Sequence, residues 1–398
     1  MDSVSIKEVE LTRKRVIMRV DYNVPLTQDG LINDDSRIKA TIPTIRYLQD
    51  RKASVILVSH LGRPKGRDSR FSLKPVKEHL EKLLEQEIIF AEDLFSEETE
   101  KISQNLKPGD IMLLENIRYY PGEEENSPIL SEAISRLGDI YVNEAFSASH
   151  RAHASTYGVP SILPGYAGLS LEQEVDYLTL VRDNPNRPMV LVLGGAKVLD
   201  KLGIIDKLLP GVDVLIIGGG MCFTFLKALG VNIGKSILEE DKIEVAREIY
   251  NRAQKEGKKI LLPIDVVVSP SLAPDSTGEI IDVRKMRNGD MGLDIGPQTV
   301  KLYTEEILKA ATIFWNGPMG VFELDAFWEG TRGVLEAFKE SRAVKIAGGG
   351  DTLSAITKGN AHTYFTFLST GGGASLELLE GKDLPGISVL RKKEKSGE

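Results

Sequence analysis

The sequence of 398 residues contains one cysteine, Cys222, so it can form neither an intrachain disulfide nor a multi-cysteine metal site. This favours a reducing compartment. The first residues lack the basic start and apolar stretch of a signal peptide, and no apolar run approaches the ~20 residues that span a bilayer. We therefore expect a cytoplasmic protein.

Positive charge is also in deficit. Lys and Arg number 50 against 58 Asp and Glu, which gives a formal net charge of −8. An acidic balance disfavours a nucleic acid or an anionic membrane as the partner. If the ligand is an anion, its cationic contacts must be concentrated locally.

Three familiar catalytic motifs are missing. Gly230-Val-Asn-Ile-Gly-Lys-Ser236 resembles a P-loop, but one residue too few separates its glycines. No Gly-x-Gly-x-x-Gly follows the first predicted strand, which disfavours a nicotinamide dehydrogenase, although nicotinamide binding would revive that reading. No Gly-x-Ser-x-Gly elbow is present.

The length and the apolar pattern predict two α/β domains. A single core rarely grows beyond roughly 250–300 residues. Short, continuous apolar runs, typical of strands buried in a parallel sheet, alternate with amphipathic segments such as 75–86 and 241–255. The strands are predicted near 16–20, 55–59, 88–90, 111–114, 140–142, 190–193, 214–217, 260–262, 313–315, 344–347 and 365–368. The fold class is α/β, with two doubly wound parallel-sheet domains joined by a hinge helix.

A helix-like run, Leu171–Leu178, lies between two sets of turn and breaker residues. Leu163-Pro-Gly165 precedes it, and Asp183-Asn-Pro-Asn-Arg-Pro188 ends it because proline cannot continue a helix. We interpret 169–186 as a connector helix between domains at 1–168 and 187–375. The alternative is an ordinary crossover helix.

Basic and polar residues follow the predicted strands of the first half. The ligands of open parallel sheets bind beyond the carboxyl ends of strands, and the planar arginine fork suits phosphate and carboxylate. A single arginine could be an ordinary surface charge. Four loops that each follow a predicted strand and carry Arg, His or other polar residues instead predict a site for a small, multiply charged anion. The candidates are Asp21, Asn23, Arg37, His60, Arg63, Arg118 and Arg151.

Glycines occupy the same positions in the second half. A glycine-rich turn that opens a helix lets the backbone N–H groups approach phosphates, although glycine also serves tight packing. Lys197 and Lys201, four residues apart, should share a helix face there. Asp351 would either cap its helix or bind Mg²⁺. The turns are Gly194-Gly195, Gly218-Gly219-Gly220, Gly348-Gly349-Gly350 and Gly371-Gly372-Gly373.

An anion half and a nucleotide half together suggest transfer of a phosphoryl group between two bound substrates. A carboxylate or phosphate acceptor is already ionised at neutral pH, so it needs no general base. Positioning and charge neutralisation would then carry the reaction.

Nine segments, in order and covering nearly the whole chain, resemble the phosphoglycerate kinase family. They are Arg19-Val-Asp-Tyr-Asn-Val-Pro25, Ser59-His-Leu-Gly-Arg-Pro64, Leu114-Glu-Asn-Ile-Arg118, His150-Arg-Ala-His-Ala-Ser155, Leu193-Gly-Gly-Ala-Lys-Val198, Ile216-Ile-Gly-Gly-Gly-Met221, Gly292-Leu-Asp-Ile-Gly-Pro297, Trp315-Asn-Gly-Pro-Met-Gly-Val-Phe-Glu323 and Gly348-Gly-Gly-Asp-Thr352. The resemblance implies two Rossmann-like lobes. It implies transfer between ATP or ADP and the carboxyl group of 3-phosphoglycerate, whose product is 1,3-bisphosphoglycerate, in glycolysis and gluconeogenesis.

The resemblance also implies residue roles. The domain at 1–168 would bind 3-phosphoglycerate, and the segment 376–398 would return to pack on it. Asp21 and Asn23 would hold the acceptor's hydroxyl group and its neighbours. Arg37 would contact the reacting groups, and the substrate phosphate would be held by His60, Arg63, Arg118 and Arg151.

The domain at 187–375 would bind the nucleotide. Lys197 would follow the transferring group, Asp351 would bind Mg²⁺, and Gly350 and Gly373 would donate backbone N–H groups near the transition state. The other implied nucleotide contacts are Lys201, Gly218, Gly219, Gly292, Asn316, Glu323, Gly349 and Thr352.

Three positions depart from the family pattern. Glu144 and Ser147 stand where the family commonly has aspartate and glycine, and Tyr22 stands where phenylalanine is common. These changes affect the expected geometry of a loop rather than the reaction.

The implied assembly is a monomer without a nucleic-acid or membrane partner. A two-lobed sugar-phosphate or nucleotide binding protein without catalysis is the alternative function. Since each half would hold one substrate, we expect hinge closure, with the hinge near 165–187 and a second crossing near 375–386.

Overall fold

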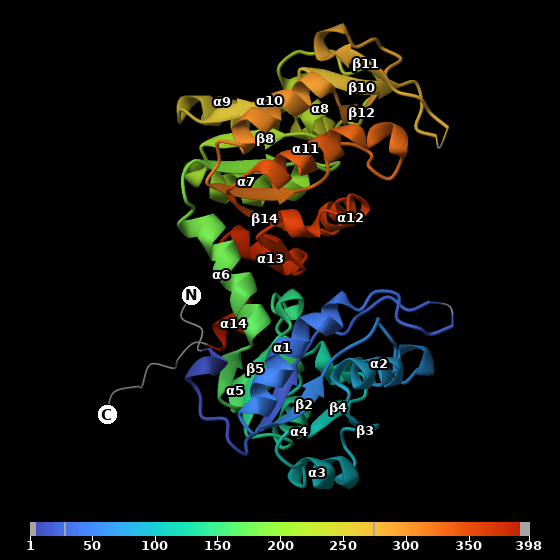
Figure 1. Ribbon diagram of the computed structural model, residues 1–398, viewed down its shortest axis with the longest axis vertical. Helices are drawn as coiled ribbons and strands as arrows, with labels where there is room; N and C mark the ends of the chain where they lie inside the picture. The colour runs from blue at the N-terminus through green and yellow to red at the C-terminus, as the bar shows by residue number, and fades with distance from the viewer. Residues whose placement is uncertain (1–4, 28, 274, 391–398) are drawn as a thin grey trace. The chain divides into compact units, whose positions relative to one another are not determined.

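The computed structural model describes residues 5–27, 29–273 and 275–390, and it divides into two compact units (Figure 1). Unit 1 runs to Asp176 and includes the segment from Asp383 onward. Unit 2 is Tyr177–Lys382. The division falls inside helix α6 (Leu169–Asp183), which begins in unit 1 and ends in unit 2.

Unit 1 contains a parallel six-stranded sheet in the order β3-β4-β2-β1-β5-β6. Its strands are β1 Arg15–Arg19, β2 Ser54–Val58, β3 Ile89–Ala91, β4 Ile111–Leu114, β5 Ile140–Asn143 and β6 Gly165–Ala167. Its helices are α1 Ser36–Asp50, α2 Lys74–Leu84, α3 Glu97–Gln104, α4 Pro128–Ser135, α5 Val159–Ile162 and α14 Pro385–Ser388.

The core of unit 1 forms where apolar helix faces cover this sheet. Every residue of β2 is buried, as expected of a strand covered on both faces. Val76 and Leu80, one helical turn apart, are the buried residues of α2 and belong to the same core cluster as Val16 and Met18 of β1. Pro75 sits in the first turn of α2, where its missing N–H costs nothing.

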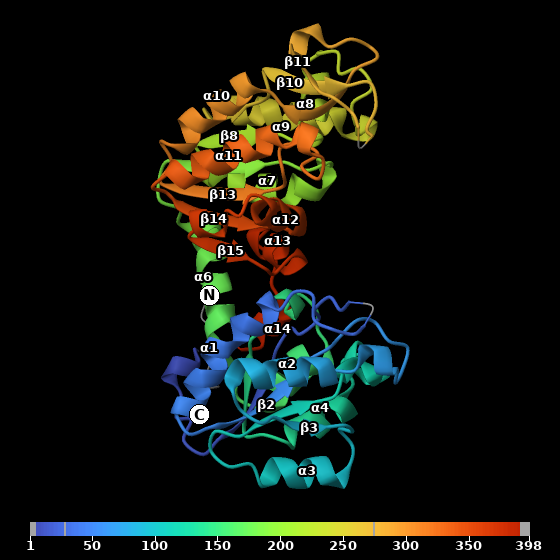
Figure 2. The same ribbon diagram turned by 45° about the vertical axis from the view of Figure 1, so that its right-hand side comes forward.

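Unit 2 contains a second parallel six-stranded sheet, in the order β15-β14-β13-β7-β8-β9. The strands are β7 Met189–Leu193, β8 Val214–Ile217, β9 Lys259–Leu261, β13 Thr312–Asn316, β14 Val344–Gly348 and β15 Phe367–Ser369. The helices are α7 Leu202–Leu208, α8 Met221–Ala228, α9 Ile243–Lys255, α10 Pro297–Ile307, α11 Glu329–Glu340, α12 Gly350–Lys358 and α13 Gly373–Leu379. Helices α10 and α11 lie side by side (Figures 1 and 2).

A small antiparallel sheet in unit 2 was missed by the sequence pattern. It has the order β11-β10-β12, with β10 Asp265–Ser269, β11 Glu279–Asp282 and β12 Met291–Ile295. Strand β11 is short and half-exposed, so it lacks the continuous apolar run that identified the other strands. Strand β6 was missed for a similar reason, because Gly165-Tyr-Ala167 is only partly buried and contains no aliphatic run.

The returning chain is attached to unit 1 by backbone contacts. Gly386 donates its N–H to the Ser149 carbonyl over 2.8 Å, and its own carbonyl accepts from the Asn143 amide over 2.8 Å. Helix α13, by contrast, belongs to unit 2, where the Leu378 carbonyl accepts from Arg182 over 2.9 Å. The segment counted with unit 1 thus starts at Asp383, seven residues after the expected 376, and 391–398 lie outside the described residues.

Candidate functional site

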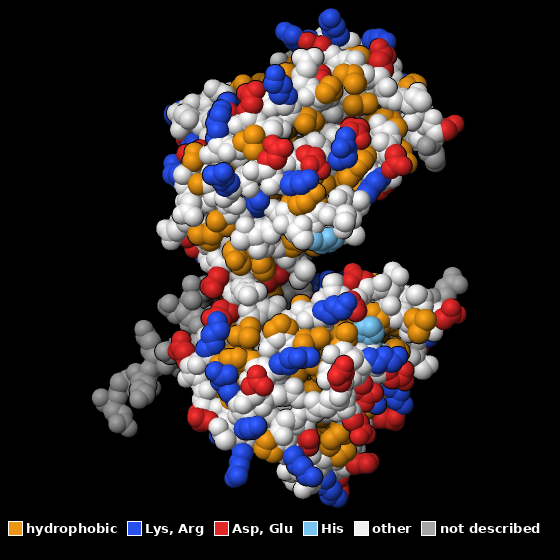
Figure 3. Space-filling model, viewed as in Figure 1, with side chains coloured by type: hydrophobic (Ala, Val, Ile, Leu, Met, Phe, Trp, Pro, Cys, Tyr) orange, Lys and Arg blue, Asp and Glu red, His pale blue; other side chains and the backbone are white. Residues whose placement is uncertain are grey.

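Four loops at one edge of the first sheet carry the polar residues of unit 1. They follow β1, β2, β4 and β5, four neighbouring parallel strands, so their carboxyl ends meet at the same edge. On the visible face, positive and negative side chains are otherwise interspersed (Figure 3). The basic character of this edge is therefore local.

Asp21, Asn23 and Arg37 form one connected group. Arg37, in the first turn of α1, donates through Nη1 to Asp21 Oδ2 over 2.6 Å. The backbone N–H of Asn23 donates to Asp21 Oδ1 over 3.1 Å, and Asn23 Oδ1 accepts from Gly62 over 2.8 Å. The structure thus brings together three predicted residues from two segments and ties them to the loop after β2.

Arg118 lies on the other side of that loop. It donates through Nη1 to the Gly62 carbonyl over 2.7 Å, and its Nε lies 3.4 Å from Glu124 Oε1. Burial and the neighbouring Arg19 and Arg151 lower the pKa of the Arg118 guanidinium. Repulsion among these cations means that a bound anion would relieve an electrostatic cost.

Burial and neighbouring arginines lower the pKa of two histidines of the cluster, which favours their neutral forms at pH 7. Burial, followed by the charges of Arg19, Arg118 and Arg37, holds the pKa of His60 well below its usual value of 6.5. Burial and nearby arginines lower the pKa of His153 to about 4. His60 was predicted as a phosphate contact, and the structure adds that it would act as a neutral hydrogen-bonding group.

Arg63 and Arg151 are the exposed arginines of the predicted set. Arg151 donates through Nε to His150 Nε2 over 3.1 Å. Within the described part of the chain, Arg63 makes no hydrogen bond or ion pair. Both guanidinium groups therefore keep donors for a ligand.

Arg19 is the cation that the sequence reading passed over. It ends strand β1, and it is 1% exposed although it carries a full charge. Its Nε donates to Ser155 Oγ over 2.7 Å, and its Nη2 lies 3.1 Å from His60 Nδ1. The available signal was an arginine directly after the apolar run Val16-Ile-Met18, where burial of its charge is costly unless it is paired.

Each of the three residues that depart from the family pattern forms side-chain hydrogen bonds within unit 1. Ser147 donates its hydroxyl to Asp21 Oδ2, so it joins the polar group around Arg37. Glu144 is buried and accepts from the Thr44 hydroxyl over 2.5 Å and from the Ser170 N–H over 3.0 Å at the start of α6. The Tyr22 hydroxyl pairs with Thr41 Oγ1 at 2.9 Å.

In unit 2, three of the four glycine turns lead directly into helices, namely α8, α12 and α13. A Cβ placed on Gly350 or Gly373 would meet no atom within 4 Å, so packing does not require glycine at either position. A Cβ on Gly218 would lie 2.5 Å from Met319 Sδ, and one on Gly292 would lie 2.0 Å from Phe223 Cζ. Packing alone thus explains some of the predicted glycines but not Gly350 and Gly373.

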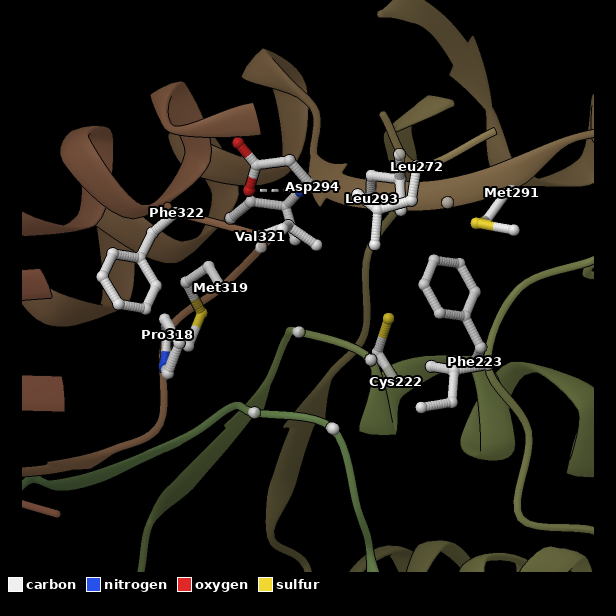
Figure 4. Close-up of a pocket in the computed structure, with 18 of the residues that line it drawn as sticks. Cys222, Phe223, Leu272, Met291, Leu293, Asp294, Pro318, Met319, Val321 and Phe322 are labelled. Atoms are coloured by element: carbon white, nitrogen blue, oxygen red, sulfur yellow. Dashed lines mark hydrogen bonds between the residues drawn. The ribbon is translucent and has the colours of Figure 1, made fainter. Parts of the chain in front are cut away.

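A cavity of about 300 Å³ opens beside these turns (Figure 4). Four of the implied nucleotide contacts line it, namely Gly219, Gly292, Glu323 and Asp351, and so do Gly195 and Gly220 of the predicted glycine turns. Most of the wall is apolar and was not predicted, because these residues look like core in the sequence. It includes Cys222, Phe223, Leu272, Met291, Leu293, Pro318, Met319, Val321 and Phe322.

The remaining predicted nucleotide residues lie near the turns rather than in the cavity wall. Asn316 accepts a short hydrogen bond from Lys201 and donates through Nδ2 to the Gly348 carbonyl over 2.7 Å. Thr352 Oγ1 accepts from the Gly317 N–H over 2.7 Å. Burial lowers the pKa of the Lys201 ammonium. Gly349 has φ +99°, a conformation that favours glycine.

The prediction that Lys197 and Lys201 share one helix face is wrong. Lys197 lies in the loop after β7, and the first helical turn, a 3-10 turn, begins at Leu199. Lys197 is exposed, whereas Lys201 is half-buried. Gly194 and Gly195 lengthen the loop, so helical spacing does not apply across it.

Asp351 occupies the first turn of α12 without a capping role. The N-cap position is Gly349, and no side-chain capping bond is present there. Asp351 is exposed, lines the cavity and acts electrostatically on Lys201. A carboxylate with this freedom fits a Mg²⁺ ion that also binds nucleotide phosphates. Among the described residues no group of three His, Cys, Asp or Glu side chains could hold a metal ion.

An arginine-rich cluster at the strand ends of one doubly wound unit, and a glycine-bordered apolar cavity on the other, are the features of a two-substrate α/β phosphotransferase. The family model for phosphoglycerate kinase matches residues 6–382. The phosphoglycerate kinase of Dictyoglomus turgidum is 51% identical over 391 residues, covering 98% of each chain. That of Pseudothermotoga lettingae is 46% identical over 397 residues, covering 99% of this chain and 100% of that one.

Solved structures of phosphoglycerate kinases also resemble this chain. Phosphoglycerate kinase from Coxiella burnetii matches with a TM-score of 0.91 and 39% identity over 98% of each chain. That from Pyrococcus horikoshii matches with a TM-score of 0.82 and 32% identity, covering 97% of this chain and 98% of that one. The chain belongs to the phosphoglycerate kinase family, and its activity is that glycolytic, ATP-dependent phosphotransfer. The alternative of a binding protein without catalysis is thereby excluded, as is a dehydrogenase.

Proposed function

We propose that unit 1 binds 3-phosphoglycerate or 1,3-bisphosphoglycerate, that unit 2 binds ADP or ATP, and that the chain catalyses 1,3-bisphosphoglycerate + ADP = 3-phosphoglycerate + ATP. The observation that carries this assignment is the separation of the two chemistries. Guanidinium groups cluster at the strand ends of unit 1, whereas unit 2 has an apolar cavity bordered by glycine turns. Small multiply charged anions need the first kind of site, and a nucleotide base with phosphates needs the second.

In unit 1, the phosphate of the substrate would be held by His60, Arg63, Arg118 and Arg151. Asp21 and Asn23 would bind its hydroxyl group. Arg37 would contact the reacting carboxyl group, since its contact with Asp21 fixes one end of the guanidinium while the side chain stays 37% exposed. These roles are the ones that the family resemblance implies, and the charge and position of the residues are compatible with them.

In unit 2, the base would occupy the cavity beside Gly218, Gly219 and Gly292, and Glu323 would bind the ribose. Lys201, Asn316, Gly349 and Thr352 would lie near the phosphates. Lys197, which is exposed in its loop, would be free to follow the transferring phosphoryl group.

Members of this family generally use a Mg²⁺-bound nucleotide, and we assign the protein's ligand for that ion to Asp351. When bound, Mg²⁺ neutralises charge on the nucleotide phosphate oxygens. The carboxylate of Asp351 would hold the ion at the mouth of the cavity.

The transfer itself needs no general base, because the acceptor carboxylate is ionised. Arg37 and Lys197 would neutralise the charge that spreads over the phosphoryl oxygens. The backbone N–H groups of Gly350 and Gly373 would donate to the same oxygens, and the open space around both glycines allows that approach.

We further propose a monomer that works in the cytoplasm. The single cysteine, Cys222, is buried and unpaired, which suits a reducing compartment. The part of the chain that the structure describes has no helix with both the length and the apolarity to cross a bilayer.

A coupled assay that follows ATP formed from ADP and 1,3-bisphosphoglycerate tests the reaction, and calorimetry of each ligand tests its location. Arg151→Gln should raise the Kd for 3-phosphoglycerate about tenfold, because a charge-assisted hydrogen bond is lost. The Kd for MgADP should not change. Arg136→Gln, an exposed arginine of the same unit, is the matched control. Equal losses of both ligands in Arg151→Gln would contradict the assignment.

A further inference from the structure

A chain of four buried polar side chains runs beneath the anion site. Ser155 donates its hydroxyl to Glu123 Oε1 over 2.5 Å and its N–H to Glu123 Oε2 over 2.9 Å. Arg19 Nε donates to Ser155 Oγ over 2.7 Å, and Arg19 Nη2 lies 3.1 Å from His60 Nδ1. Glu123, Ser155 and Arg19 are each 1% exposed, and His60 is 7% exposed.

The direction of these hydrogen bonds is fixed by chemistry. A guanidinium group has five N–H donors and no acceptor, and it stays protonated in proteins. His60 Nδ1 must therefore accept from Arg19. At the other end, the Ser155 hydroxyl uses its hydrogen for Glu123 and its oxygen lone pair for Arg19. If any of these hydrogen bonds ran in the opposite direction, two donors would face each other.

This direction determines the tautomer of His60. A neutral imidazole that accepts at Nδ1 carries its proton on Nε2. Protonation at Nδ1 would point an N–H at the Arg19 guanidinium and place two cations 3.1 Å apart in a buried site. Burial and three arginines lower the pKa of His60, in agreement with the neutral form. Among the described residues, no group hydrogen-bonds to His60 Nε2.

We propose that Arg19 is a positioning residue that fixes His60 as the Nε2–H tautomer, so that His60 offers one N–H donor to the phosphate of the substrate. Ser155, which Glu123 orients, holds the Arg19 guanidinium in place together with the Val20 carbonyl, which accepts from Arg19 Nη1. The fixed tautomer follows from the geometry alone, and only its use toward phosphate rests on the proposed function. The opposite tautomer would turn a lone pair toward a phosphate oxygen, which repels it.

The first test measures the tautomer directly in the ligand-free wild-type protein. Histidine is labelled with ¹⁵N, and the two ring nitrogens are distinguished by ¹H–¹⁵N NMR, with His60→Asn used for assignment. We expect Nε2 to be protonated and Nδ1 unprotonated at pH 7. A protonated Nδ1, an imidazolium or a mixture of tautomers in the wild-type protein would overturn the inference.

The second test removes one of the two acceptors that hold Arg19 and leaves the Val20 carbonyl in place. Ser155→Ala deletes the acceptor of the Arg19 Nε–H, and we expect a mixture of His60 tautomers. The Kd for 3-phosphoglycerate should rise about fivefold to tenfold, the effect of one weakened hydrogen bond, and the Kd for MgADP should stay unchanged. Ser135→Ala is the matched control, since Ser135 is also buried in unit 1 and bonds only to the Ser131 carbonyl.

The two tests separate this inference from the assignment of substrates. If 3-phosphoglycerate does not bind the wild-type protein while His60 shows the Nε2–H tautomer, the substrate assignment fails and the tautomer stands. If Ser155→Ala folds and leaves the tautomer unmixed, Arg19 is not held by Ser155 in the way proposed. Should that variant fail to fold, the wild-type spectrum alone decides.

Discussion

Arg37 and Asp21 form a 2.6 Å ion pair between the first turn of α1 and the loop after β1. The same Asp21 oxygen also accepts from the Ser147 hydroxyl, so three segments of unit 1 meet at one carboxylate. This pairing fixes the direction of the Arg37 side chain. Its other N–H donors remain available to a ligand.

We predict that Arg37→Ala lowers turnover by about 10²–10³-fold, the typical loss when one preorganised donor to the transition state is removed. The melting temperature should change little, because the side chain is partly exposed. Turnover in the coupled assay and thermal unfolding are measured together. Arg46→Ala, an exposed arginine of the same helix, is the control. Near-normal turnover in folded Arg37→Ala would refute the catalytic assignment.

Asp351→Asn should weaken binding of MgADP and MgATP by at least about tenfold and leave 3-phosphoglycerate binding unchanged, because the amide loses the charge that holds Mg²⁺. Calorimetric titration of each ligand, with and without Mg²⁺, measures the effect. Nucleotide binding without Mg²⁺ should not weaken, since a negative charge near the phosphates is removed. Glu305→Gln, an exposed acid in α10, serves as control. A loss that is the same with and without Mg²⁺ would make Asp351 a structural residue.

Glu144→Gln should change how stability depends on pH. Burial raises the pKa of the Glu144 carboxyl from 4.5 to about 7, against the hydrogen bonds from Thr44, Ser170 and Leu171. A raised pKa in the folded state means that the folded protein binds this proton more tightly than the unfolded chain does. The contribution of Glu144 to stability is therefore fully present below pH ~4.5 and is lost as pH rises to about 7.

Glu144→Gln has no carboxyl group to titrate, so its stability does not fall in this way as the pH rises. We take the free energy of unfolding of Glu144→Gln minus that of the wild type. Apart from a constant offset, this difference should increase between pH ~4.5 and ~7. The increase should be roughly 3 kcal/mol at most, since a tenfold change in proton affinity corresponds to about 1.4 kcal/mol. Urea unfolding across this range measures it. Glu132→Gln, which is exposed in α4, should give a flat difference. A flat difference for Glu144→Gln as well would mean that its carboxyl is charged throughout.

Binding of both substrates should compact the protein. In the proposed assignment each unit holds one substrate, while in-line transfer needs reacting atoms about 3–3.5 Å apart with water excluded. Small-angle scattering should therefore give the smallest radius of gyration with 3-phosphoglycerate and a non-hydrolysable ATP analogue together. Each ligand alone is the control. If the ternary complex scatters like the free protein, with both ligands shown to be bound, hinge closure is not part of the reaction.

The sequence alone determined the fold class, because a strand buried on both faces must be apolar along its whole length. Strands β7 and β8 are of this kind and were located within one residue. The same reasoning missed β11, where half the side chains meet solvent and no apolar run is required. The family could also be predicted, because its motifs survive at the ends of these strands.

The candidate site was only partly accessible to the sequence. Residues at strand ends, such as Asp21, Arg118 and Gly219, could be named because the carboxyl edge of a parallel sheet is where ligands bind. The apolar wall of the cavity could not, since Phe223 and Met319 have the same pattern as core residues. Nor could the loop position of Lys197, because its spacing from Lys201 is also that of a helix.

What only the tertiary structure decided is which polar groups face one another and in which direction. Glu123, Ser155, Arg19 and His60 are separated by up to 136 positions in the sequence, yet they form one hydrogen-bonded chain. Composition and sequence spacing do not give the distance in space between residues that are so far apart in the chain. The charge of a buried histidine and the tautomer it adopts depend on that distance, because desolvation and the direction of each donor act only over a few ångströms.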